Sequence, residues 1–168
     1  MCKTNRAQPT SDGAFSAKLA ALAAMPARLA QIATSIAPAQ WKTRARDGGF
    51  SLQEHACHLR DIEIEAYRVR LERMLVETTP NLPDVDGGKL AHERDYHRQD
   101  LAKAQATFSA VRADMLQRLA GLSAEQRRRS GILEGVGEVT IEGLVAKMLE
   151  HDAEHLSDLT QLRQELAG

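Results

Sequence analysis

Two histidines near the C-terminus, His151 and His155, stand four residues apart in a segment with helical periodicity. At this spacing both imidazoles project from one helix face, one turn apart, which is a geometry that suits a divalent metal ion. The apolar neighbours Leu144, Met148 and Leu159 place both rings on the face that points toward the core. Because an unpaired buried polar group costs roughly 1–3 kcal/mol, we expect either a metal ion or carboxylates across the core to satisfy the two rings.

A second histidine pair, His55 and His58, offers a third ligand. A helical wheel leaves both rings on the inward side, and periodicity alone favours His55 because it lies nearer the centre of the apolar stripe. Side chains near a metal site often orient the ligand rings through their free ring nitrogens. Five side chains could do so here, or could be ordinary helix-surface groups: Glu54, His55, Asp61, Asp152 and Glu154.

The elements that must position these residues are predicted to be helices. The chain has 168 residues, of which 43% are hydrophobic and 4% aromatic, so it has the size of one domain with a real core. The aliphatic residues are mostly Ala and Leu, and β-branched runs are too short for a sheet. We therefore expect an all-α fold, with a disordered leader at residues 1–12 and a single domain at residues 13–168.

Four helices are expected from the apolar spacing. The first starts near Phe15 and is interrupted at Pro26. The second starts at the capping box that Ser51 and Glu54 form, with Phe50 as a hydrophobic staple. The third covers residues 91–119, and the fourth follows a glycine-rich stretch and runs from about residue 140 to 166. The residues 80–88 between the second and third helices are rich in Pro, Asp and Gly, and are long enough to cross most of the bundle. We therefore predict a four-helix bundle with a long crossover between helices 2 and 3.

Charge and composition argue against several classes of partner. The net charge is −1 with 27% charged residues, which is unlike a protein that binds nucleic acid through a basic face. The run at residues 127–129 is the one basic block, and we interpret it as solvated surface or a local phosphate contact. No apolar run is long enough for a membrane span. Since there is no signal-peptide pattern and only Cys2 and Cys57 are present, we expect a cytoplasmic protein without a disulfide framework.

The order of these motifs resembles the DinB superfamily of four-helix bundles, whose members include metalloenzymes. Phe50-Ser51-Leu52-Gln53-Glu54 through His58-Leu59-Arg60-Asp61-Ile62-Glu63 is similar to the start of helix two in that family. The resemblance continues through the crossover, through Phe108 and Arg112, and into the segment from His151 to Leu156. This chain has Phe50 where many relatives have Trp, and Asp158 where many have Gln. Those differences do not touch the ligand positions of the family.

The resemblance implies a three-histidine metal site made of His58, His151 and His155, which replaces the preference of periodicity for His55. Nickel and zinc would both suit such ligands. It also implies an activity: the metal could activate a low-molecular-weight thiol for transfer to an electrophile, in a pocket shaped by the loop at residues 84–88. From their place near the start of the third helix, His92, Tyr96 and His97 could line the mouth of that pocket, or could equally be a solvated helix end. A small-molecule substrate and a homodimer are expected.

Two other functional classes stay open at this point. The bundle could bind a metal or a small ligand without turnover, for example as a stress-response accessory protein. It could also be a purely structural dimerising bundle whose histidines need no metal.

Overall fold

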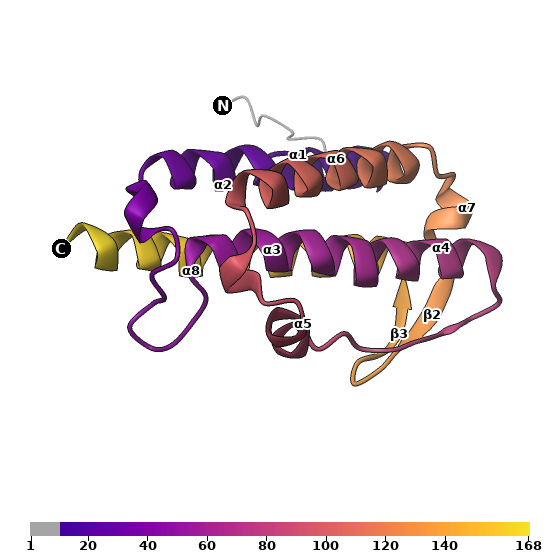
Figure 1. Cartoon of the computed structure of the whole chain (residues 1–168). Coiled ribbons are helices and arrows are strands. Elements are labelled where there is room, and N and C mark those ends of the chain that lie inside the picture. The colour runs from indigo at the N-terminus through magenta and orange to yellow at the C-terminus, as the bar shows by residue number, and fades with distance from the viewer. Residues whose placement is uncertain (1–10) are drawn as a thin grey trace, which may run out of the picture.

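Four helical rows lie side by side in the computed structural model, which describes residues 11–168 (Figure 1). The first row is broken at Ala24, next to Pro26, as expected. The second row continues through a π-helical segment without a break. The rows are α1 (Ser11–Ala23) with α2 (Met25–Thr34); α3 (Leu52–Ile62) with the π-helix η2 (Glu63–Arg68) and α4 (Val69–Val76); α6 (Leu101–Ala120); and α8 (Ile141–Ala167).

The second and third rows run parallel, because the chain returns along the whole bundle before α6 begins (Figure 1). Near the start of both rows, Gln53 donates a hydrogen bond to the carbonyl oxygen of Tyr96 at 2.9 Å, and near their ends Arg118 pairs with Glu72 at 3.2 Å. The four-helix bundle with a long crossover is thereby confirmed. The crossover contains short elements: β1 (Asn81–Leu82), α5 (Gly87–Glu93) and the 3-10 turn η3 (Tyr96–Arg98).

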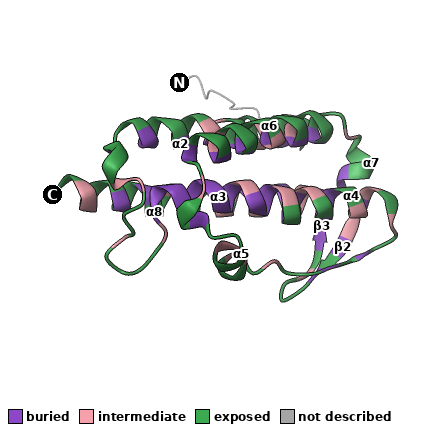
Figure 2. Ribbon diagram, in the orientation of Figure 1, coloured by how far each residue is buried: buried purple, intermediate pink, exposed green. Residues whose placement is uncertain are grey.

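Helix α3 begins where the capping box predicts. The Ser51 side chain accepts from the backbone N–H of Glu54, and the Glu54 carboxylate accepts from the backbone N–H of Ser51 at 2.9 Å. The crossover covers the side of α3 that a bundle helix usually exposes, so the residues from Leu52 to Leu59 are all buried (Figure 2). This explains how a helix rich in polar residues can lie in the interior.

The π-helix changes the phase of the second row. The apolar periodicity of the second helix predicts one inward stripe, but Val69 at its end is 40% exposed while Leu71 and Met74 are fully buried. The stripe consists of Leu52, His55, Leu59, Ile62, Ala66 and Val69. A π-helical turn contains one residue more than the period of 3.6 allows for, so the inward face moves by about 100° along the wheel. The stripe prediction is therefore correct up to Ala66 and wrong beyond it.

A small three-stranded sheet corrects the expectation that the chain has no strands. β2 (Ser130–Leu133) pairs antiparallel with β3 (Gly137–Thr140), and β1 from the crossover pairs parallel with β2. The hairpin turn needs left-handed backbone at Gly135 and Gly137, with φ of +74° and +100°. The glycine-rich stretch is thus a hairpin at one end of a bundle that is otherwise helical.

Two predicted helix boundaries also differ. The third helix starts at Leu101, not at residue 91, because Asp95 adopts a left-handed φ of 46° and Asp100 caps a new helix by accepting from the N–H of Lys103. The first helix starts at Ser11, so residues 11 and 12 of the expected leader belong to α1. Residues 1–10 lie outside the described residues.

The basic run at residues 127–129 has a structural role at two of its three positions. Arg127 is buried, pairs with Asp12, and lies over the ring of Phe15 at 4.6 Å. Arg129 donates to the carbonyl oxygens of Met74 at 2.6 Å and Glu77 at 2.8 Å, which satisfies the C-terminal end of α4. The interpretation as solvated surface is wrong for these two side chains.

Among residues 11–168, no helix combines the length and the apolar character that a membrane crossing requires.

Candidate metal centre

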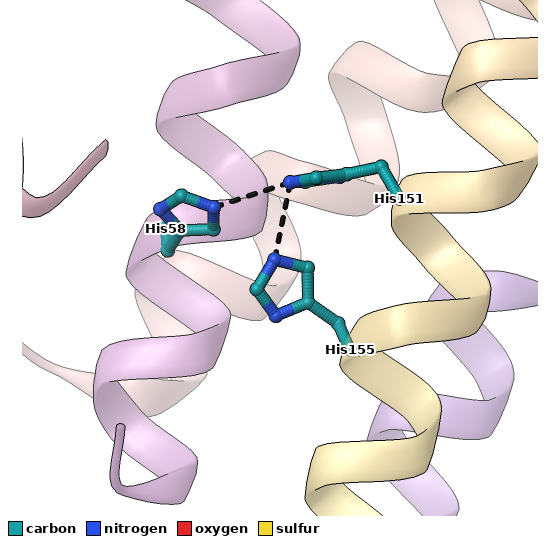
Figure 3. A group of neighbouring side chains, drawn as sticks. All are labelled: His58, His151 and His155. Atoms are coloured by element: carbon teal, nitrogen blue, oxygen red, sulfur yellow. Dashed lines mark hydrogen bonds between the residues drawn. The ribbon is translucent and has the colours of Figure 1, made fainter. Parts of the chain in front are cut away.

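Three histidine rings from two helices converge in the space between these helices (Figure 3). His58 comes from α3, and His151 and His155 come from successive turns of α8. The Nε2 atom of His151 lies 3.2 Å from Nε2 of His58 and 3.1 Å from Nε2 of His155. The structure thus brings together the three residues that the family resemblance implied, and their Nε2 atoms face one another.

The spacing of these nitrogens fits a shared metal ion. Each nitrogen of a neutral imidazole carries either one proton or one lone pair. The Nε2 atom of His151 therefore has only a single proton or a single lone pair to share between the Nε2 atoms of His58 and His155. A cation between the rings would use all three lone pairs at once. Zinc–nitrogen bonds of about 2.0–2.1 Å in tetrahedral geometry separate the ligand nitrogens by about 3.3 Å, close to the distances observed. Three imidazoles leave at least one coordination position for a substrate, as in catalytic sites.

Burial keeps the rings neutral, which is the form that binds metal. Desolvation is the first cause for each ring, and the neighbouring histidines lower the pKa of His55, His151 and His155 further. The pKa falls to about 4 for His55, about 4 for His58, about 3 for His151 and about 2 for His155. All four imidazoles therefore offer lone pairs at neutral pH.

His55 is the one predicted orienting residue that the structure places on a candidate ligand. Its Nδ1 lies 2.9 Å from Nδ1 of His155, on the side of that ring opposite Nε2. If His155 Nε2 holds a metal, its Nδ1 carries the proton and donates it to His55. Periodicity was right that His55 points inward, since it is 3% exposed, but His58 is the ring that meets His151.

The four carboxylates that were candidates for orienting the rings form their hydrogen bonds elsewhere or are exposed. Within residues 11–168, none of them forms a hydrogen bond with His58, His151 or His155. The reason is that basic side chains or caps occupy the buried ones. Glu54 caps α3 and pairs with Arg44; Asp61 accepts from Arg60 at 2.6 Å, Tyr96 at 2.8 Å and Arg94 at 2.9 Å; Asp152 pairs with Arg112; Glu154 is exposed on α8.

A buried guanidinium holds the helices around the site in register. Arg112 of α6 donates to Glu63 at 2.8 and 3.0 Å, to Asp152 at 2.6 and 3.0 Å, and to the carbonyl oxygen of Leu22 at 3.1 Å. Burial raises the pKa of both carboxyls although Arg112 opposes this, because one guanidinium does not fully compensate two desolvated carboxylates. The group thus fixes Asp152, the residue that follows His151 on α8, against α6.

Arg112 was not predicted to lie in the core. The structure buries Arg112 to 1% exposure. Arg112 follows Phe108 by four residues, which places both side chains on the same face of the helix. This spacing was the sequence signal that could have predicted the burial of Arg112.

The sequence of this bundle matches a known protein family. The sequence profile described as the DinB superfamily matches residues 21–159 of the chain, which include all three converging histidines. The chain belongs to the DinB superfamily. The prediction made from the order of the motifs is therefore confirmed.

This DinB superfamily member is similar in sequence and in structure to one bacterial relative. It is 24% identical, over 143 residues, to a protein of Bacillus subtilis (strain 168) named "Putative metal-dependent hydrolase YfiT"; the match covers 84% of this chain and 80% of the relative. A solved structure of YfiT superposes with a TM-score of 0.85 at 21% identity and covers 99% of this chain and 94% of that one. Its description mentions an unusual four-helix bundle topology, and the TM-score shows that this chain shares that fold.

The crossover of this DinB bundle presses directly on His58. A Cβ atom added at Gly87, the first residue of α5, would lie 2.8 Å from Nδ1 of His58. That Nδ1 atom is buried and has no hydrogen-bond partner within the described chain. Phe50 packs on the ring from another side, at 5.3 Å between centroids. Packing against Gly87 and Phe50, with no hydrogen bond to Nδ1, therefore sets the orientation of His58.

We expect Gly87→Ala to weaken metal binding by roughly tenfold or more, the scale seen when a ligand loses its orienting contact. The added methyl group must displace the His58 ring, because the space is already filled. Affinity measured by competition with a chromophoric chelator checks this.

The matched control is Gly88→Ala, whose Cβ would meet only the Asp86 carboxylate at 3.3 Å. It should bind metal as the unmodified protein does. Equal affinities for both variants would contradict the steric role of Gly87.

Proposed function

We propose that this protein is a metal-dependent enzyme in which His58, His151 and His155 hold one divalent ion, zinc or nickel. The observation that carries the proposal is the convergence of three neutral Nε2 atoms at 3.1 and 3.2 Å. The name of the relative YfiT supports metal dependence for the family. A divalent ion held by three uncharged imidazoles keeps its positive charge, and would lower the pKa of a thiol or water bound beside it.

We further propose that the nucleophile is a low-molecular-weight thiol that enters from solution. The chain's described thiol, Cys57, cannot serve, because it is fully buried and burial raises its pKa to about 11. The buried carboxylates near the rings are already paired with arginines, so they are poorly placed to act as a general base for water. A thiol needs no such base once its pKa is lowered.

A surface cavity that is lined in part by Phe50 could receive the electrophile. It has a volume of about 360 Å³ and shares Phe50 with the metal centre, since that ring packs on both His55 and His58. His92, Tyr96 and His97, which were expected at the mouth of a pocket, all line it, together with Arg44. The volume suits a small molecule.

The assay that tests the proposal follows thioether formation between a model electrophile, 1-chloro-2,4-dinitrobenzene, and several small thiols, with zinc- or nickel-loaded protein. We expect a rate above the uncatalysed reaction that His58→Ala removes. Ester hydrolysis without any thiol would favour the hydrolase reading that the name of YfiT suggests. Absence of both activities in metal-loaded protein would overturn the enzyme and leave a non-catalytic metal-binding bundle.

A further inference from the structure

A second group of metal-binding side chains adjoins the three-histidine centre. It consists of His55 on α3 and of His155 and Asp158 on α8, whose candidate ligand atoms all lie within 4.8 Å of one another. His155 belongs to both groups. Its Nε2 faces His151, and its Nδ1 lies 2.9 Å from Nδ1 of His55.

We propose that His55, His155 and Asp158 form a second divalent-cation site, so that the ring of His155 bridges two ions. The proposal rests on the three-histidine centre, because His155 has to be held there through Nε2. A single imidazole can bind one ion at each nitrogen after losing its proton, and both nitrogens of His155 face ligand groups here.

Two negative groups would oppose the repulsion between the two ions. The first ion keeps its full positive charge, because its ligands His58 and His151 are uncharged. The second ion would meet the carboxylate of Asp158 and the anionic form of His155, which together offset much of the repulsion between two divalent ions. Asp158 is exposed on α8, which gives an ion access from solvent, while His55 is 3% exposed and rigidly packed.

Binding of the second ion changes the hydrogen bond between the two rings. With one ion bound, Nδ1–H of His155 donates to the lone pair of Nδ1 of His55. When the second ion enters, the Nδ1–H bond of His155 breaks and the proton leaves to solvent. The freed lone pairs of His155 and His55 then bind the ion together with an oxygen of Asp158. No oxidant or reductant takes part.

Equilibrium dialysis against increasing free Zn²⁺, followed by elemental analysis of the full chain, tests the proposal. We expect the unmodified protein to rise from one to two ions per chain, and Asp158→Asn and His55→Gln to stop at one. Asp158 is exposed, so its variant should fold normally. Glu154→Gln and His92→Gln replace exposed residues outside the group and should still reach two ions.

A plateau at one ion in the unmodified protein, or two ions in Asp158→Asn, would overturn the second site and leave the three-histidine centre standing. A plateau at zero would instead overturn the proposed function. Loading with Cu²⁺ tests the shared ring separately: two coppers bridged by His155 should show an electron paramagnetic resonance intensity below two spins, whereas Asp158→Asn should show one full spin. Two bound coppers with full intensity would contradict the bridge.

Discussion

Replacing His151 and His155 together by alanine should remove the tightly bound metal. The two residues supply two of the three converging Nε2 atoms, and one remaining imidazole, His58, cannot hold a divalent ion strongly. We expect close to one ion per chain in protein purified without chelator and dialysed against metal-free buffer, and less than a tenth of that in the double variant. Elemental analysis of both proteins measures this.

The control keeps the number of removed histidines the same. His92 and His97 are exposed and line the neighbouring cavity, so His92→Ala with His97→Ala should retain the ion. Retention of metal in the His151 and His155 double variant would show that another group holds it. A folded unmodified protein that stays metal-free after loading with zinc and nickel would refute the metal centre and leave the structural bundle as the better interpretation.

Replacing Arg112 by methionine should destabilise the bundle by about 3–5 kcal/mol, because the change leaves Glu63 and Asp152 buried without their cation. Methionine fills much of the space of the arginine stem, so loss of the charge dominates over a cavity. Urea unfolding monitored by circular dichroism gives the change in the free energy of unfolding. Metal affinity should fall as well, since Asp152 holds the backbone next to His151 in place.

Arg118→Met on the same helix is the matched control. Arg118 pairs with Glu72 and Asp114, but all three side chains are about half exposed, so its removal should change the free energy of unfolding by no more than about 1 kcal/mol. A similar small change for Arg112→Met would mean that the buried group contributes little to stability.

Local patterns in the sequence predicted much of this fold. The capping box at Ser51 and Glu54, the break near Pro26 and the length of the crossover each depend on residues close together in the chain, and each was confirmed. The hairpin was not predicted, because its strands have only four residues each and depend on pairing with one another and with β1. The π-helix was not predicted either, because an apolar pattern with a period of 3.6 does not show where the helix contains an extra residue.

Side-chain partners in the site were harder to predict for a related reason. Asp152 and Asp61 were candidates for orienting histidines, but Asp152 pairs with Arg112 of α6, and Asp61 pairs with the adjacent Arg60 and with Arg94 at the end of α5. Arg112 and Arg94 lie far from these carboxylates in sequence, and a single chain gives no information about which distant cation meets which carboxylate. Periodicity could show that His55 and His58 both point inward, but only the packing of α8 and of Gly87 distinguishes them.

The separation of the converging histidines along the chain governs how the protein folds. His58 and His151 are 93 residues apart, and they meet only after the crossover has closed and α8 has docked. A metal ion therefore cannot nucleate folding, as it does in domains whose ligands are neighbours in sequence. It acts on the finished bundle instead: an ion present at about a hundred times its dissociation constant adds about 2.7 kcal/mol to global stability. Metal depletion in the cell would thus raise the globally unfolded fraction about a hundredfold, and proteolysis of the whole chain, rather than of one loop, would increase with it.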